Sequence, residues 1–214
     1  MNQSRTMTIA TVAVVVLILA AAIVIPRLGG SEQPAAATID YSGQPIVGRD
    51  DAPVKMLVFF DFLCPHCATF SETVTSVLKR EYVANGDLAI HFANFPVIAP
   101  QGMSRTLAIL GECVNRQGRD GFGVLEPVLL RAQSTLTTVA RAIDLAEEFV
   151  PGLDRPALES CVQGSQTASA VDADIQLARS LGVQGTPTVF VDGRLVSNPT
   201  LANVRSAVDA ALGR

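Results

Sequence analysis

An apolar segment followed by two cysteines constrains the fold of this chain more than any other part of its sequence. Val54 to Phe60 are apolar except for Lys55 and include several β-branched and aromatic residues, a pattern typical of a strand buried on both faces. Cys64-Pro65-His66-Cys67 follows at once, and apolar residues then recur at helical spacing until Asn85-Gly86. We therefore expect the cysteine pair on the first turn of a helix that follows a central strand of an α/β sheet.

The rest of the sequence predicts an α/β unit that is interrupted by helices. From about Pro100 to Val162 no strand pattern is present, and apolar residues at helical spacing indicate three helices. Pro151-Gly152 and Arg155-Pro156 are interpreted as breaks that follow or separate these helices. Asp192-Gly193 is a typical hairpin turn. The other expected elements are strands at 88–92, 188–191 and 195–196 and helices at 168–181 and 201–212.

Cys64 and Cys67 carry the chemistry that this arrangement favours. The free N–H groups and the dipole at a helix N-terminus stabilise an anion, so Cys64 is the candidate nucleophile. Cys67, one turn later, is expected to close a disulfide with Cys64 or to resolve a mixed disulfide. A protonated His66, next to Pro65, would lower the pKa of Cys64 further and make the disulfide a stronger oxidant.

Two other roles for this close cysteine pair remain open on the sequence. A zinc site would need a second close pair, whereas Cys113 and Cys161 are 48 positions apart and only His66 and His91 could assist. A purely structural disulfide in the pair would close so short a loop that it would stabilise the fold little. We interpret His91, in an expected strand, as a packing residue, and we expect no metal site.

An apolar segment near the start of the chain predicts a membrane anchor. Thr6 to Pro26 are 21 consecutive uncharged residues, and as a helix they would span about 31 Å, close to the hydrocarbon thickness of a bilayer. A cleaved secretory signal is the alternative, but its apolar region usually has only about 7–15 residues. Residues 27–44, rich in Gly, Pro, Ala and Ser, are expected to tether a folded body outside the cytoplasm.

Two motifs of this sequence resemble those of a known family. Asp61 to Cys67 (DFLCPHC) and Gly182 to Gly193 (GVQGTPTVFVDG) are similar to the motifs of thioredoxin-fold thiol–disulfide oxidoreductases of the DsbA type, especially the membrane-anchored bacterial members. The resemblance extends over residues 45–214 and implies a thioredoxin fold with an inserted all-helical domain, preceded here by one N-terminal transmembrane helix. The expected segments are a cytoplasmic N-terminus at 1–5, the anchor at 6–26, a linker at 27–44, the thioredoxin core at 45–99 and 165–214, and the helical insertion at 100–164.

The resemblance also implies roles for residues beyond the cysteine pair. It implies that Thr186-Pro187 is a cis peptide bond against the active site, that the backbone beside Pro187 pairs with substrate, and that Thr186 tunes thiol reactivity. The alternative for Pro187 is an ordinary proline at the start of a strand. The family usually has a buried acid six positions before the nucleophile, where this chain has Val58. Proton transfer to the second cysteine would then use water or another group, with Asp61 and Lys55 as candidates.

Cys113 and Cys161 fall near the start and the end of the helical block. An extracytoplasmic location permits disulfides, and a bond closing a loop of this length could contribute up to about 4 kcal/mol in the chain-entropy model. Similar anchored members of the family often pair cysteines in these two places. We therefore expect a structural disulfide, the alternative being two buried free thiols.

The expected function is that of a single-pass membrane oxidoreductase with its catalytic domain outside the cytoplasm. The Pro-His dipeptide is the one found in DsbA oxidases, so we expect the Cys64–Cys67 disulfide to pass to exported proteins with free thiols. The family implies reoxidation by a quinone-linked membrane partner, and no organic or metal cofactor is required. The same site run as a reductase or isomerase is the nearest alternative, and a peptide-binding or chaperone module with incidental thiols is another.

The charge of the chain excludes one class of partner. Fourteen basic and twenty acidic residues follow residue 30, so no basic field exists to hold nucleic acid. No extra N-terminal dimerisation domain is evident, and we expect a monomer.

Overall fold

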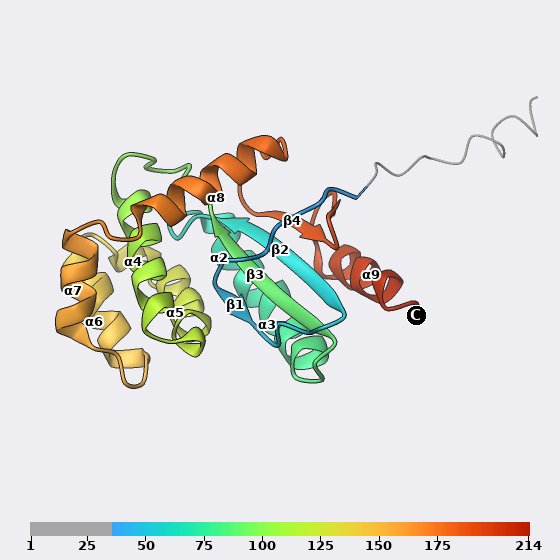
Figure 1. Cartoon of the computed structure of the whole chain (residues 1–214), viewed down its shortest axis with the longest axis horizontal. Helices are drawn as coiled ribbons and strands as arrows, with labels where there is room; N and C mark the ends of the chain where they lie inside the picture. Colours follow the sequence, from blue (N-terminus) through green and yellow to red (C-terminus); the bar gives the residue numbers. More distant parts are fainter. Residues whose placement is uncertain (1–35) are drawn as a thin grey trace, which may run out of the picture. The chain divides into compact units, whose positions relative to one another are not determined.

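The computed structural model describes residues 36–214, which form a five-stranded mixed sheet surrounded by helices (Figure 1). The strand order is β1-β3-β2-β4-β5, with β2 and β3 parallel and every other neighbouring pair antiparallel. The strands are β1 (Ile46–Val47), β2 (Val54–Phe60), β3 (Leu88–Asn94), β4 (Thr188–Val191) and β5 (Arg194–Leu195).

The anchor predicted at 6–26 lies outside the described residues. Among residues 36–214, no helix is both long enough and apolar enough to be a membrane span.

The central strand β2 is buried on both faces, as its apolar sequence predicts. Met56, Val58 and Phe60 face the main core, where they pack with the helices that follow β2 and with α9 (Leu201–Ala211). Leu57 and Phe59 face the opposite side and pack against residues of α8 (Ala168–Ser180). Helices therefore cover both faces of the sheet, which is the arrangement that a continuous apolar strand requires.

A long helical segment follows β2 and begins at the cysteine pair. It consists of α2 (Pro65–Phe70), η1 (Ser71–Thr75), α3 (Ser76–Leu78) and η2 (Lys79–Val83), where η1 and η2 are π-helical turns. It ends before Gly86, whose φ of +78° is a backbone conformation that glycine adopts readily.

The connection between β3 and β4 is all-helical, which confirms the predicted helical insertion. It contains α4 (Met103–Gln117), α5 (Arg119–Arg131), η3 (Gln133–Thr135), α6 (Val139–Phe149), α7 (Arg155–Gln163) and α8. Helix α7 was not predicted, because Arg155-Pro156 resembled a break between helices. Proline is tolerated in the first turn of a helix, and Asp154 caps this one by accepting a hydrogen bond from the Ala157 N–H at 3.0 Å.

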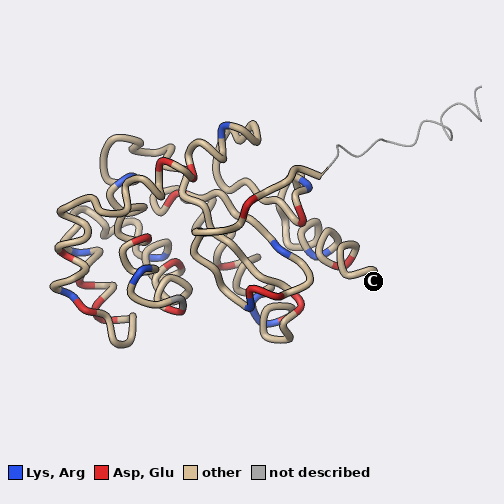
Figure 2. Tube along the Cα trace, viewed as in Figure 1, with Lys and Arg blue, Asp and Glu red and all other residues tan. Residues whose placement is uncertain are grey.

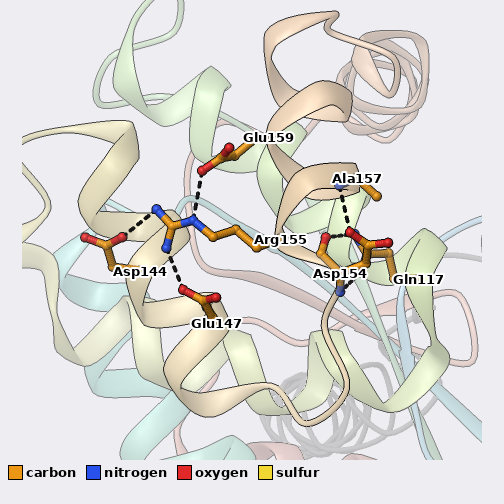
Figure 3. A network of polar contacts seen from close by, with 7 residues as sticks. All are labelled: Gln117, Asp144, Glu147, Asp154, Arg155, Ala157 and Glu159. Carbon is orange, nitrogen blue, oxygen red and sulfur yellow. Dashed lines mark hydrogen bonds and ion pairs between the residues drawn. The ribbon is translucent and has the colours of Figure 1, made fainter.

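Arg155 connects α7 to α6 at the surface (Figure 3). Its guanidinium contacts Asp144 at 2.8 Å, Glu147 at 2.6 Å and Glu159 at 2.9 Å. Three carboxylates around one guanidinium form a network, which stabilises a fold more than isolated exposed ion pairs do. Elsewhere along the described chain, basic and acidic residues lie interspersed (Figure 2).

A buried polar group joins the end of β3 to helices α4 and α8. The Asn94 side-chain amide donates to Glu112 at 2.8 Å and to Asp174 at 3.1 Å, and the Asn94 backbone N–H donates to Asp174 at 2.8 Å. Burial, followed by the charge of Asp174, raises the pKa of Glu112 to about 8. Burial likewise raises the pKa of Asp174 to about 6. The folded protein therefore retains protons here at pH values where exposed carboxyl groups have lost them.

We expect the free energy of unfolding to fall as pH rises, because of Glu112. Its pKa is higher in the folded than in the unfolded chain, so its contribution is complete below its ordinary value of 4.5 and is lost as pH rises towards about 8. The slope from one such group approaches about 1.4 kcal/mol per pH unit. Glu112→Gln should flatten the dependence of the free energy of unfolding on pH. Urea unfolding at several pH values, with a chelator present, measures this dependence. Glu148→Gln, at an exposed position of α6, is the control, and parallel curves for the wild-type chain and Glu112→Gln would contradict this expectation.

Candidate active site

Cys64 caps the N-terminus of α2, directly after the loop that leaves β2. The Cys64 carbonyl accepts hydrogen bonds from the N–H groups of Cys67 at 3.0 Å and Ala68 at 3.2 Å, which form the first helical turn. Pro65 occupies the start of the helix, where its missing N–H costs nothing. Both cysteines are free thiols and buried, with 4% of Cys64 and 2% of Cys67 exposed, whereas Pro65 and His66 are exposed.

The second sequence motif lies against the first. The peptide bond between Thr186 and Pro187 is cis, and the Cys64 sulfur lies 3.4 Å from the Thr186 carbonyl oxygen, to which it donates a hydrogen bond when protonated. The two segments meet because β4, which begins at Thr188, pairs with β2 so that Thr188 lies opposite Phe59. The sheet register thus brings together residues that are more than 120 positions apart in the sequence.

The two thiols differ strongly in acidity. The hydrogen bond from the Cys67 thiol, then the Thr186 side chain and the backbone N–H groups of Cys67 and His66, lower the pKa of Cys64 to about 5 although burial opposes this. The hydrogen bond to the Cys64 sulfur, and then burial, raise the pKa of Cys67. At neutral pH the site therefore holds a thiolate on Cys64 beside a protonated Cys67.

Asp61, one of the two candidates for proton transfer, braces the loops of the site. One carboxylate oxygen accepts from the Leu63 N–H at 2.9 Å, and the other accepts from the N–H groups of Val97 at 2.8 Å and Ile98 at 2.9 Å. The other candidate, Lys55, lies near the opposite end of β2 from the cysteine pair. Of these two candidates for proton transfer, only Asp61 lies at the site in the structure.

Glu126 of α5 is a buried acid that the sequence analysis missed. Only 2% of the residue is exposed, one carboxylate oxygen lies 3.6 Å from the Lys79 Nζ, and burial raises its pKa. Ser71, Thr75 and Lys79 follow Cys67 at intervals of four, so they lie along one face of the same helical segment. Lys79 and Ser71 oppose this rise in pKa, so the acid lies beside the helical segment that carries Cys67. A lone charge within the apolar stretch 124–130 was the available signal.

Gln133 is the second residue that the sequence analysis missed. Its side-chain amide donates to the carbonyl oxygens of Phe62 and Cys64, each at 2.9 Å. Nearby, the Phe62 and Phe122 rings lie 6.3 Å apart, so helix α5 also packs against the loop before Cys64. The helical insertion therefore contributes directly to the site. The sequence gives no signal for this role, because an isolated glutamine in a polar turn has many other uses.

Cys113 of α4 and Cys161 of α7 form a disulfide with an S–S distance of 2.03 Å. They are therefore not available to complete a zinc site with Cys64 and Cys67. His91 is buried in β3, and its ring lies 4.8 Å from that of Tyr41. The structure thus brings together the close cysteine pair and the 186–187 peptide, and it separates His91 from them.

The chain is similar to known proteins over most of its length. A family model described as thioredoxin matches residues 40–210. The "probable disulfide bond formation protein D" of Bacillus anthracis is 32% identical over 203 residues, 93% of this chain and 92% of that protein. The "disulfide bond formation protein D" of Bacillus subtilis is 28% identical over 160 residues, 73% of this chain and 71% of that protein.

Solved structures show the same fold. The crystal structure of oxidised BdbD from Bacillus subtilis matches with a TM-score of 0.75 at 24% identity and covers 84% of this chain and 98% of that chain. Chlamydia trachomatis DsbA matches with a TM-score of 0.72 at 20% identity and covers 83% and 94%. The predicted thioredoxin fold with a helical insertion is thereby confirmed.

Proposed function

Because this chain belongs to the DsbA-like family of thioredoxin-fold thiol–disulfide oxidoreductases, we propose that it introduces disulfides into exported proteins. The observation that carries the direction of the reaction is the low pKa of Cys64, about 5 against an ordinary value of 9.0. A stabilised Cys64 thiolate favours the reduced pair, so the oxidised pair gives up its disulfide readily. The names of the two Bacillus relatives support the same reaction.

The catalytic cycle transfers two electrons from a substrate dithiol to the cysteine pair. A substrate thiolate attacks the Cys64 sulfur, the Cys64–Cys67 bond breaks, and Cys67 leaves as a thiolate that takes a proton. The second substrate thiol loses its proton and attacks the substrate sulfur of the mixed disulfide. Cys64 then leaves as a thiolate, which the first turn of α2 stabilises, and the substrate leaves with a new disulfide.

We propose that two parts of the site contact the substrate. Cys64 receives the attack, and the backbone beside the cis Thr186-Pro187 bond pairs with the substrate chain. The Thr186 carbonyl lies 3.4 Å from the Cys64 sulfur, which supports this placement. Pro65 and His66, between the two cysteines, are exposed. A quinone-linked membrane partner reoxidises the reduced enzyme.

The equilibrium with glutathione tests the direction. The full chain is equilibrated at graded ratios of reduced and oxidised glutathione, and the Cys64–Cys67 disulfide is quantified by alkylation and mass spectrometry. We expect a potential nearer to the value of about −120 mV for DsbA than to the value of about −270 mV for thioredoxin. A value near that of thioredoxin would overturn the oxidase direction in favour of a reductase or isomerase. A Cys64→Ser chain that refolds a reduced substrate as fast as the wild-type chain would favour a chaperone module.

Residues 6–26 are proposed to anchor the enzyme in the membrane, with the catalytic body outside the cytoplasm. The support is the length of the uncharged run, together with a redox site whose disulfide persists in an oxidising compartment. Membranes washed with alkaline carbonate should retain the full-length chain. Release of a protein whose N-terminus begins after the apolar run would show instead that the segment is a cleaved signal.

A further inference from the structure

Gln133 links the helical insertion to the turn that carries the nucleophile. It lies in η3, between helices α5 and α6, and its side-chain nitrogen lies 2.9 Å from the carbonyl oxygens of both Phe62 and Cys64. An amide nitrogen carries two hydrogens, so each carbonyl receives one. The two carbonyls flank Leu63, immediately before the helix that begins at Pro65.

The partial charges of these two carbonyl oxygens affect the ionisation of the Cys64 sulfur. Each carries a partial negative charge within the same turn as the Cys64 sulfur, and both would oppose a negative charge on that sulfur. The Gln133 hydrogens place partial positive charge on both oxygens. They also hold the turn from which the backbone N–H groups of His66 and Cys67 lower the pKa of Cys64.

We propose that Gln133 is a positioning residue, through which the helical insertion holds the turn at residues 62–64 and favours the thiolate form of Cys64. Its side-chain nitrogen contacts the two carbonyl oxygens, and it acts on the sulfur through them. The proposal rests on the proposed function only in taking Cys64 as the nucleophile. It assigns the insertion a part in the reactivity of the site in addition to any part in binding substrate.

Three substitutions distinguish this role from simple packing. Gln133→Met keeps the length of the side chain and removes the donors, Gln133→Glu replaces the donors with negative oxygens, and Gln133→Lys keeps donors on a stem of similar length. Ser134→Ala, at an exposed position of the same turn, is the matched control. The readout is the pKa of Cys64, from the ultraviolet absorbance of the thiolate and from the pH dependence of alkylation by iodoacetamide.

We expect the pKa of Cys64 to rise when the Gln133 donors are removed, and to rise further when a negative charge replaces them. Gln133→Met should raise it by about 0.5 to 1 unit, because one or two hydrogen bonds near an ion contribute energies of this size. Gln133→Glu should raise it further, whereas Gln133→Lys and Ser134→Ala should leave it at or below the wild-type value. The equilibrium constant for oxidation of glutathione should fall about 3- to 10-fold in Gln133→Met, which corresponds to about 15 to 30 mV.

The order of the three variants decides the outcome. A packing role predicts that Met, Glu and Lys shift the pKa alike, in proportion to the loss of thermal stability, and that result would overturn the proposal, as would an unchanged pKa in all three. If Gln133→Met fails to fold, the test is that Gln133→Glu raises the pKa of Cys64 whereas Gln133→Lys does not. A thioredoxin-like potential of the wild-type chain would overturn the oxidase direction alone, since the order of pKa values does not depend on it.

Discussion

Replacing Cys67 with serine is expected to stop turnover, because the chain can no longer form the Cys64–Cys67 disulfide with which the catalytic cycle begins. The Cys64 thiolate would still attack a disulfide, because the Thr186 side chain and the first turn of α2 still lower its pKa and a serine hydroxyl can donate in place of the Cys67 thiol. Serine cannot displace a monothiol such as glutathione from Cys64, so release of that adduct would depend on an external thiol at millimolar concentration. Because an oriented intramolecular group reacts with a very high effective concentration, turnover should fall by at least about 10³-fold.

Intact mass spectrometry of Cys67→Ser after treatment with oxidised glutathione should show one stable glutathione adduct, mapped to Cys64. Cys64→Ser is the matched variant and should form none, because the remaining Cys67 is buried and this burial by itself raises its pKa. Thermal unfolding of both variants checks that they are folded. Adducts on Cys67 in Cys64→Ser, or normal turnover by Cys67→Ser, would show that the two cysteines have been assigned to the wrong roles.

Removing the Cys113–Cys161 disulfide is expected to lower the free energy of unfolding by about 4 kcal/mol, as the chain-entropy model gives for a loop of this length. The two residues are 48 positions apart, so their bond restricts the unfolded chain strongly. The melting temperature should fall by roughly 10 °C, since about 1 kcal/mol corresponds to about 2 to 4 °C in a chain of this size. Alanine is the replacement at both positions, because a serine hydroxyl would be buried there.

The comparison needs a background in which no other disulfide changes. Both chains would carry Cys64→Ser and Cys67→Ser, so that they differ only at positions 113 and 161. Urea unfolding measures the difference in stability, and non-reducing peptide mapping of the parent shows whether the bond is present. A difference below about 1 kcal/mol would contradict the stabilising role. Unlinked Cys113 and Cys161 peptides from the oxidised parent would contradict the bond itself.

The Cys113–Cys161 disulfide also closes the loop that carries the insertion residues at the site. The loop that it closes contains Phe122, Glu126 and Gln133. Through these residues the insertion packs on Phe62, places a buried acid beside the helix of the cysteine pair, and holds the turn before α2. A loosened insertion is therefore expected to affect the chemistry of Cys64 as well as the stability of the chain.

Much of the fold could be predicted because its signals are local. The apolar run 54–60, the Asp192-Gly193 turn and the helical periodicity after Pro100 each depend on a few neighbouring residues, and each matches the structure in kind. The start of α7 was not predicted, because Arg155-Pro156 is compatible with a break between helices as well as with the first turn of a helix. The exact segment boundaries, and the anchor outside the described residues, stay predictions.

The sequence by itself determined the nucleophile pair and its position at a helix start, because both depend on four adjacent residues after a buried strand. Tertiary structure alone decided which groups surround that pair. Gln133 reaches the carbonyls of Phe62 and Cys64 from about 70 positions away, and Glu126 reaches the helix of Cys67 from another helix. Contacts of this kind depend on how helices pack on a sheet, and no local pattern encodes that packing, so the environment that sets the acidity of Cys64 emerges only from the folded chain.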